Sequence, residues 1–129
     1  MNTSIVKLSP ELLALVGTGN ANSLMPFSRE IFLLDIIVAG TTYCEKIHDI
    51  EPELKPATVL RMIRQPNNKH DELAIAIYHN DLQIGWVPQQ LNAVISRLMD
   101  AGKEFFCRIE SVEDVGSWVK INAKIYMVE

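Results

Sequence analysis

Apolar and polar residues alternate through most of the second half of the chain, with the two-residue period of β-strands. In residues 58–64, for example, Leu60 and Met62 fall on one face while Arg61 and Ile63 fall on the other. Polar turn residues separate the alternating segments, which predicts hairpin connections between neighbouring strands. This pattern predicts strands at residues 58–64, 73–78, 82–87, 104–112 and 118–128.

Residues 31–43 form a longer apolar run that is rich in β-branched and aromatic side chains. The run predicts a further strand, buried along much of its length. Gly40 within it predicts a bulge or a bend. Residues 45–56 are rich in acidic side chains and contain two prolines, so they are predicted to form a surface loop or a sheet edge.

A helix is predicted to begin at Pro88 and to end near Gly102, because proline is favoured in the first turn and glycine just after the last. Apolar residues recur within it at the helical period. The opposite face carries polar residues, including Asn92 and Ser96. The predicted buried face consists of Leu91, Val94, Ile95, Leu98 and Ala101.

The N-terminal part, residues 1–26, is predicted to be separate from the body of the protein. A short helix is expected to start at Ser9, a favoured N-cap residue, and to end at Gly17. A helix this short is not stable alone, so it either docks on the body or stays mobile. A tail that binds a partner is the functional alternative.

Six strands, one strong helix and one weak helix are therefore expected, with hairpins and no run of βαβ crossovers. This combination favours a mainly β, α+β fold, an antiparallel β-barrel with about two appended helices, over a parallel sheet. With 129 residues, of which 48% are hydrophobic, the chain is long enough for one globular domain. We place that domain at residues 27–129.

The net charge and the two cysteines restrict the functions and the cellular compartment that we expect. A formal net charge of −4 argues against broad, nonspecific binding to nucleic acid or to anionic membranes, although a local basic groove remains compatible with it. No apolar stretch is long enough to span a membrane as a helix, and the first residues do not resemble a secretory signal. Cys44 and Cys107 fit free thiols better than a disulfide framework. We therefore expect a cytoplasmic protein.

Common enzyme signatures do not occur in the sequence. It has no nucleophile elbow, no phosphate-binding Gly-Lys-Ser/Thr loop, no dinucleotide-binding glycine fingerprint, and no Cys-x-x-Cys or His-Glu-x-x-His motif. The best metal-ligand pair is His70 with Asp71, but its spacing is not typical of a zinc site. We expect a protein without catalytic activity, resident metal or cofactor.

The polar loop that follows residues 58–64 carries the most informative side chains. Asp71 either caps amides of the loop or, with Asn68, offers hydrogen-bonding groups to a ligand, and these two roles are compatible. Trp86 lies between a glycine and a Val-Pro pair. It is either an exposed platform on which a nucleobase stacks or a half-buried side chain against Tyr43 or the helix, and Tyr43 has the same two interpretations.

Three segments together resemble the HIRAN domain family. They are Val-Ala-Gly-Thr-Thr-Tyr at 38–43, the segment from Leu60 to Ile77 that contains Gln-Pro-x-Asn-x-x-Asp, and Ile-Gly-Trp-Val-Pro at 84–88. The resemblance covers roughly residues 31 to 128. It implies an OB-like barrel with two helices, of a kind that occurs in replication-fork remodelling helicases and in small stand-alone bacterial proteins.

The resemblance also implies a function and a site. In the helicase members the domain holds the 3′-hydroxyl end of single-stranded DNA between the first strand, the polar loop and the Gly-aromatic turn. The pattern differs here at four positions: Thr41 and Thr42 replace an Arg-Tyr pair, His70 replaces an aromatic residue, and Gln89 replaces a lysine. Arg64 is added as a basic residue that can border the site. The candidate nucleic-acid-binding residues are thus Thr41, Thr42, Tyr43, Arg64, Asn68, His70, Asp71, Trp86 and Gln89.

Three hypotheses follow. The first is a non-enzymatic domain that recognises single-stranded DNA, in particular its 3′ end, in DNA repair or replication-fork processing. The second is a protein-interaction or regulatory module without nucleic-acid binding, which uses residues 1–26 or a sheet edge. The third is a metal-dependent hydrolase built on His70 and Asp71.

Overall fold

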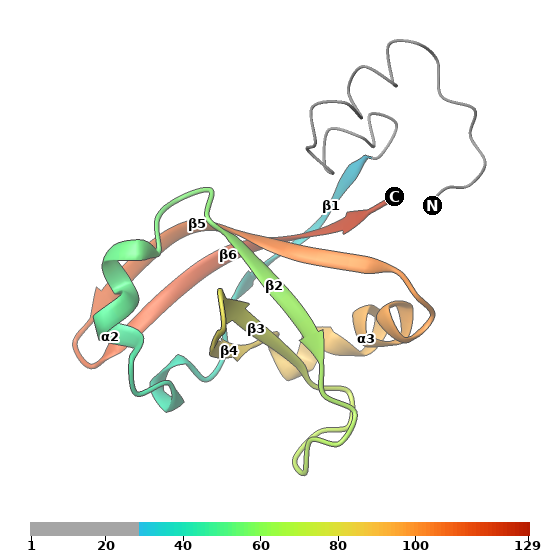
Figure 1. The fold of residues 1–129 in the computed structure, drawn as a ribbon, viewed down its shortest axis with the longest axis horizontal. Coiled ribbons are helices and arrows are strands. Elements are labelled where there is room, and N and C mark those ends of the chain that lie inside the picture. Colours follow the sequence, from blue (N-terminus) through green and yellow to red (C-terminus); the bar gives the residue numbers. More distant parts are fainter. Residues whose placement is uncertain (1–28) are drawn as a thin grey trace.

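One antiparallel sheet organises the computed structural model, which describes residues 29–129 (Figure 1). Its strand order is β1-β6-β5-β2-β3-β4, and every neighbouring pair is antiparallel. The predicted class of six antiparallel strands with two helices is confirmed. The strands are β1 (Glu30–Ile37), β2 (Val59–Arg64), β3 (Ile75–His79), β4 (Leu82–Trp86), β5 (Glu104–Val115) and β6 (Trp118–Val128).

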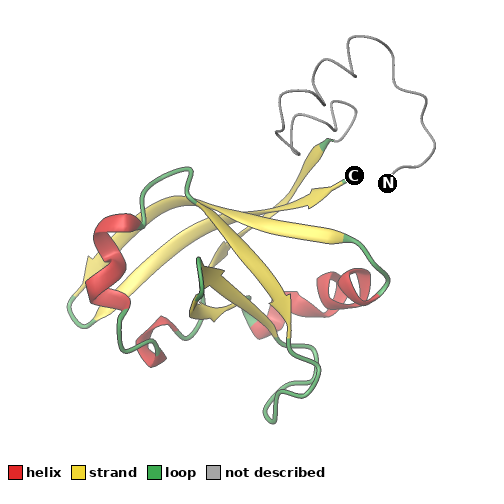
Figure 2. Ribbon diagram, viewed as in Figure 1, coloured by secondary structure: helices red, strands yellow, loops and turns green. Residues whose placement is uncertain are grey.

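Two α-helices and three 3-10 turns complete the described part of the chain (Figure 2). They are α2 (Ile47–Ile50), α3 (Asn92–Asp100), η2 (Thr41–Tyr43), η3 (Glu51–Glu53) and η4 (Gln89–Leu91). The two α-helices lie at opposite ends of the sheet in Figure 2. The predicted N-terminal helix and linker lie outside the described residues, so the division at residue 26 stays a prediction.

The sheet curls until its two outer strands meet at one residue pair. Ala39, just beyond β1, forms a bridge with Trp86 at the end of β4. The Ala39 amide donates to the Trp86 carbonyl at 2.8 Å, and the Trp86 amide donates to the Ala39 carbonyl at 2.8 Å. Within residues 29–129 the barrel is therefore closed at a single point and not along a full strand pair.

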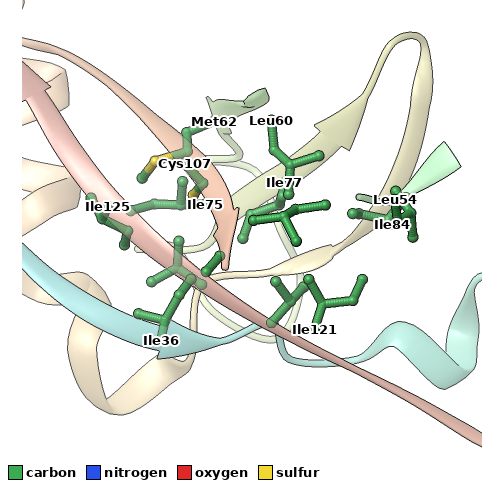
Figure 3. Close-up of a cluster of buried hydrophobic side chains, with 14 of the residues drawn as sticks. Ile36, Leu54, Leu60, Met62, Ile75, Ile77, Ile84, Cys107, Ile121 and Ile125 are labelled. Atoms are coloured by element: carbon green, nitrogen blue, oxygen red, sulfur yellow. The ribbon is translucent and has the colours of Figure 1, made fainter. Parts of the chain in front are cut away.

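The core fills the inside of this curved sheet. Alternate residues of each strand point inward, so removing their apolar surface from water is the main stabilising contribution. Leu60 and Met62 are buried while Arg61 and Ile63 are exposed, which confirms the predicted faces of β2. Figure 3 shows part of this cluster, with labels on Ile36, Leu54, Leu60, Met62, Ile75, Ile77, Ile84, Cys107, Ile121 and Ile125.

The predicted strand at 31–43 was wrong in length and in burial. β1 ends at Ile37, and Gly40, with φ of 73°, turns the chain into η2, as the predicted bend required. Within β1 only Ile36 is buried, whereas Phe32 is 48% exposed. The reason is position, because β1 is an edge strand of the described sheet and pairs along its length only with β6.

Residues 45–56 form a short helical segment and not an irregular loop. α2 and η3 lie here, and they direct Ile47 and Leu54 into the core, each only 3% exposed. Three apolar side chains, Ile47, Ile50 and Leu54, among many polar ones were too weak a signal for a helix. This segment covers the end of the barrel near the turn between β5 and β6 (Figure 1). β5 also runs to Val115, further than predicted.

The predicted buried face of α3 was also wrong in part. Val94 is 68% exposed, Leu91 is 42% exposed and Ala101 is also exposed, whereas Asn92 and Ser96 are almost fully buried beside Ile95. Burial of Asn92 is possible because its amide has a partner in the polar loop described below, and the Ser96 hydroxyl donates to a backbone carbonyl. Hydrophobic periodicity could not detect a helix face that is held by polar contacts.

The closing bridge predicts that Gly85 does not tolerate a side chain. A Cβ at Gly85 would collide with the Ala39 carbonyl oxygen and would lie 2.6 Å from Cγ1 of Val38. We expect Gly85→Ala to lower the free energy of unfolding by about 1–3 kcal/mol, measured by urea denaturation. Gly116→Asn is the control, because Gly116 has open space around it and asparagine tolerates its φ of +66°. Equal stability of both variants would contradict a tight closure.

The buried thiol of Cys107 gives a second prediction. Burial raises the pKa of this thiol to about 12, above its ordinary value of 9.0. Between these two values the thiol stays protonated in the folded chain but ionises in the unfolded chain. The contribution of the buried neutral thiol to the free energy of unfolding is therefore lost as pH rises from about 9 toward 12.

Burial of Cys107 also predicts that native protein reacts with a thiol reagent only at the less buried Cys44. Cys44→Ser should react only after unfolding, and rapid native labelling of that variant would refute the burial.

Candidate functional site

The loop between β2 and β3 is held in shape by its own side chains. Asn68 uses its side-chain oxygen to accept from the amides of His70 (2.8 Å) and Asp71 (3.1 Å). The base of the loop is closed by the Gln65 amide, which donates to the Ala74 carbonyl at 2.9 Å. Asparagine commonly stabilises turns in this way. The Pro-Asn-Asn break in the sequence thus becomes a defined turn.

Asp71 links this loop to α3. One carboxylate oxygen accepts from the amide of Leu73 at 2.9 Å, and the other accepts from the side-chain amide of Asn92 at 2.8 Å. Asn92 is only 2% exposed, so this bond satisfies a donor that would otherwise be buried alone. Both oxygens are engaged within the protein, which favours the structural interpretation of Asp71.

Arg64 braces the same loop from the end of β2. Its guanidinium makes two hydrogen bonds to the Asp100 carboxylate, at 2.8 and 3.1 Å, and donates to the carbonyls of Ala74 (2.7 Å) and Glu72 (3.0 Å). The hydrogen bond from Arg64 lowers the pKa of the Asp100 carboxyl below its ordinary value. The predicted binding residue Arg64 is therefore committed to the loop and to α3.

Tyr43 and Trp86 form an aromatic pair beside the closing bridge. The rings meet edge to face, with centroids 6.5 Å apart and an interplanar angle of 79°. Tyr43 is 81% exposed, whereas Trp86 is half-buried. Gly40 lies against the indole, since a Cβ there would be 2.6 Å from Cε3 of Trp86. Of the two interpretations, Trp86 fits the half-buried one and Tyr43 the exposed one.

A chain of amide side chains connects this pair to the loop. The side-chain oxygen of Gln65 accepts from Nε1 of Trp86 at 2.9 Å and from Nδ2 of Asn68 at 3.0 Å. Its nitrogen donates to Gln83 at 3.2 Å, and the hydroxyl of Tyr78 lies 3.5 Å from the same Gln83 oxygen. We call this surface the aromatic–amide face. It consists of Tyr43, Gln65, Asn68, Tyr78, Gln83 and Trp86.

Sequence reasoning missed three members of this face, namely Gln65, Tyr78 and Gln83. The strand register of the predicted hairpin could have revealed two of them, because Tyr78 and Gln83 are cross-strand partners on its outward face. Gln65 directly precedes the proline of the loop, and it is the acceptor that joins Trp86 to Asn68. None of the three residues carries a charge, which is why a search for charged or catalytic groups passed over them.

The remaining predicted residues have different surroundings. Thr41 is 1% exposed, and its hydroxyl donates to the Val119 carbonyl at 2.9 Å, so it anchors η2 to β6 and offers nothing to the surface. Thr42, His70 and Gln89 are exposed. The structure thus brings Tyr43, Asn68 and Trp86 together through Gln65, while Thr41 and Arg64 hold the framework.

A single curved sheet with such a face defines the chain as a small OB-like barrel domain. More specifically, it belongs to the HIRAN domain family, whose model matches residues 31–128. No curated protein sequence matches the chain significantly. No helix in residues 29–129 has the length and apolarity needed to cross a bilayer.

Two solved structures have a similar fold. One is a protein from Lactobacillus plantarum, determined by a structural genomics consortium, with 17% identity and a TM-score of 0.72 over 79% of this chain and 98% of that chain. The other is the HIRAN domain of human HLTF, with 17% identity and a TM-score of 0.60 over 77% of this chain and 78% of that chain. At these identities the two neighbours show the fold alone.

The link from Asp71 to Asn92 predicts a structural phenotype for the loop. Asp71→Ala leaves the buried amide of Asn92 without this acceptor, so we expect a loss of about 1–3 kcal/mol in the free energy of unfolding. Glu72→Ala is the matched control, because Glu72 is an exposed acid in the same loop and its change should stay within about 0.5 kcal/mol. Chemical denaturation of both variants measures the difference, and equal effects would exclude the proposed link.

Proposed function

We propose that this chain is a non-enzymatic domain that binds single-stranded nucleic acid at the aromatic–amide face. The observation that carries the proposal is the exposed ring of Tyr43, set edge-on to Trp86 beside the hydrogen-bonded amides of Gln65 and Asn68. Membership of the HIRAN domain family supports the same class of ligand. We also propose, from the resemblance in sequence, that the bound segment is the 3′ end of DNA and that the context is repair or replication-fork processing.

Stacking is the main interaction that this face offers. Tyr43 presents most of its ring to solvent, and a base stacked on an aromatic side chain contributes about 1–3 kcal/mol. The amides of Gln65 and Gln83 carry both donors and acceptors, which are the groups that read base edges. Because hydrogen bonds already orient these side chains, little conformational entropy is lost when a ligand binds.

A row of outward side chains continues from this face around the sheet. The register places one residue from each strand in this row. Phe106 and Tyr126 stack at 5.3 Å, and the Arg108 guanidinium lies 4.9 Å from both ring centroids. Aromatic rings interleaved with guanidinium groups support a path for further nucleotides. The row, from β4 to β1, consists of Gln83, Tyr78, Arg61, Phe106, Tyr126 and Phe32.

The charges on this surface imply weak, salt-sensitive binding. Arg61 is exposed and forms no ion pair within residues 29–129, so it is available to a phosphate. Arg108 and Lys124 are instead paired with Glu30 and Asp35, each at 2.7 Å. With only one or two phosphates neutralised, we expect a slope of log affinity against log salt of about −1, following roughly −0.7 per contact for single strands.

We further propose a reducing compartment such as the cytoplasm as the place of action. Both cysteines of the chain, Cys44 and Cys107, are free thiols. Proteins of oxidising compartments more often pair their cysteines.

A second candidate function, a protein-interaction module, is favoured by the apolar edge strand β1, where Phe32, Leu33 and Ile37 are exposed.

Fluorescence anisotropy with a short labelled single strand tests the proposal. Tyr43→Ala should weaken binding by roughly 5- to 150-fold, which corresponds to one lost stacking contact of about 1–3 kcal/mol. Its stability should be unchanged because the ring is 81% exposed. Val115→Ala is the control, since Val115 is an exposed apolar residue at the β5–β6 turn, and it should bind like the unaltered chain.

A strand with a phosphorylated 3′ end, compared with a free 3′-hydroxyl, tests recognition of the end itself. Weaker binding of the blocked strand supports end recognition, and equal binding restricts the proposal to the strand. Absence of saturable binding at low salt would refute nucleic-acid binding. A protein partner that is retained after nuclease treatment and lost on deletion of residues 1–26 would then favour the interaction module.

A further inference from the structure

Three side chains that ligate metals converge at the end of the barrel beside α2. His48 lies in α2, Glu51 opens η3, and Asp114 lies near the end of β5. Nδ1 of His48 is 3.7 Å from Oε1 of Glu51 and 4.0 Å from Oδ2 of Asp114. All three ligand atoms lie within 4.8 Å of one another. This is the one such group of three or more within residues 29–129.

The spacing is close to that of a coordination sphere. Nitrogen and oxygen ligands lie about 2.0–2.2 Å from a zinc-like ion, so their mutual distances are roughly 3–3.5 Å. The present separations of 3.7 and 4.0 Å exceed this range, so the side chains would have to move closer together to bind an ion. The side chains of His48, Glu51 and Asp114 are 50%, 28% and 48% exposed, so the cluster is open to solvent on one side and a metal ion can reach it.

The local charge favours a cation. Within the described residues no lysine or arginine pairs with Glu51 or Asp114, and His48 is the partner of both. The neighbouring Lys120 is directed to Glu113 instead, at 3.7 Å. Two carboxylates with a single imidazole between them carry a net negative charge whenever that imidazole is neutral. A divalent cation would neutralise the two carboxylates and would also be coordinated by the imidazole nitrogen of His48.

We propose that His48, Glu51 and Asp114 bind a divalent transition-metal ion of the zinc class. One imidazole and two carboxylates suit such an ion better than Mg²⁺ or Ca²⁺, which prefer oxygen ligands alone. Three protein ligands leave at least one coordination position for water. The site lies away from the β2–β3 loop (Figure 1) and differs from the His70–Asp71 pair considered from the sequence.

The ion would join two parts of the chain that are distant in sequence. His48 and Glu51 belong to the segment that directs Ile47 and Leu54 into the core, and Asp114 belongs to the long β5–β6 hairpin. Since a metal that binds only the folded state stabilises it by mass action, Zn²⁺ should raise the thermal midpoint of the protein.

Titration of the untagged full-length chain with Zn²⁺ alone, followed by calorimetry and thermal unfolding, tests the site. We expect one equivalent to bind. His48→Gln and Asp114→Asn should each weaken binding by at least about tenfold and should abolish the zinc-dependent rise in thermal midpoint. His79→Gln is the matched control, because His79 also faces a carboxylate, Glu53 at 3.1 Å, but pairs with no second one within residues 29–129.

Co²⁺ in place of Zn²⁺ identifies the ligand type. Nitrogen and oxygen ligands give d–d absorption without thiolate charge-transfer bands, which separates this site from any binding through Cys44. Residues 1–28 contain no histidine or cysteine, so they do not supply the imidazole. Binding that is equally tight in His48→Gln and Asp114→Asn, or no binding at millimolar Zn²⁺, would overturn the proposal. The three residues would then form an ion-pair cluster only.

Discussion

The two hydrogen bonds between Ala39 and Trp86 are the constraint on which the rest of the structure depends. They join the two outer strands of the sheet, and within residues 29–129 they are the point at which the curled sheet closes on itself. The pair needs close approach on both sides, which Gly40 and Gly85 permit. The same contact brings Trp86 beside Tyr43. Closure of the fold and assembly of the aromatic pair are therefore one event.

Most polar groups around the β2–β3 loop serve the protein itself. Asn68 and Asp71 satisfy backbone amides and a buried side chain, and Arg64 uses its guanidinium on a carboxylate and two carbonyls. What remains for a ligand is an exposed ring and oriented amides, with few free cations. The nucleic acid proposed to bind there would therefore be held by stacking more than by charge, in keeping with the acidic character of the whole chain.

The sequence predicted what depends on short-range periodicity. Alternation located the strands and the inward faces of β2, and the Pro-Asn-Asn break located the loop. It failed where burial depends on position in the finished sheet. β1 is apolar yet exposed because it is an edge, and Thr41 is polar yet buried because η2 lies against β6. The network through Gln65 needed three segments folded together, so no local pattern could reveal it.

The hydrogen bonds of Arg64 and Gln65 anchor both ends of the β2–β3 loop. Arg64 fixes the end of the loop that leads into β3, at Glu72 and Ala74. The amide of Gln65 fixes the end that follows β2. Both ends are thus anchored independently of the tip, and lengthening a surface loop between fixed ends costs only about 0.6 kcal/mol per doubling of its length. The exposed Lys69 at the tip takes no part in these anchoring contacts, so a substitution of its side chain should leave the barrel unchanged.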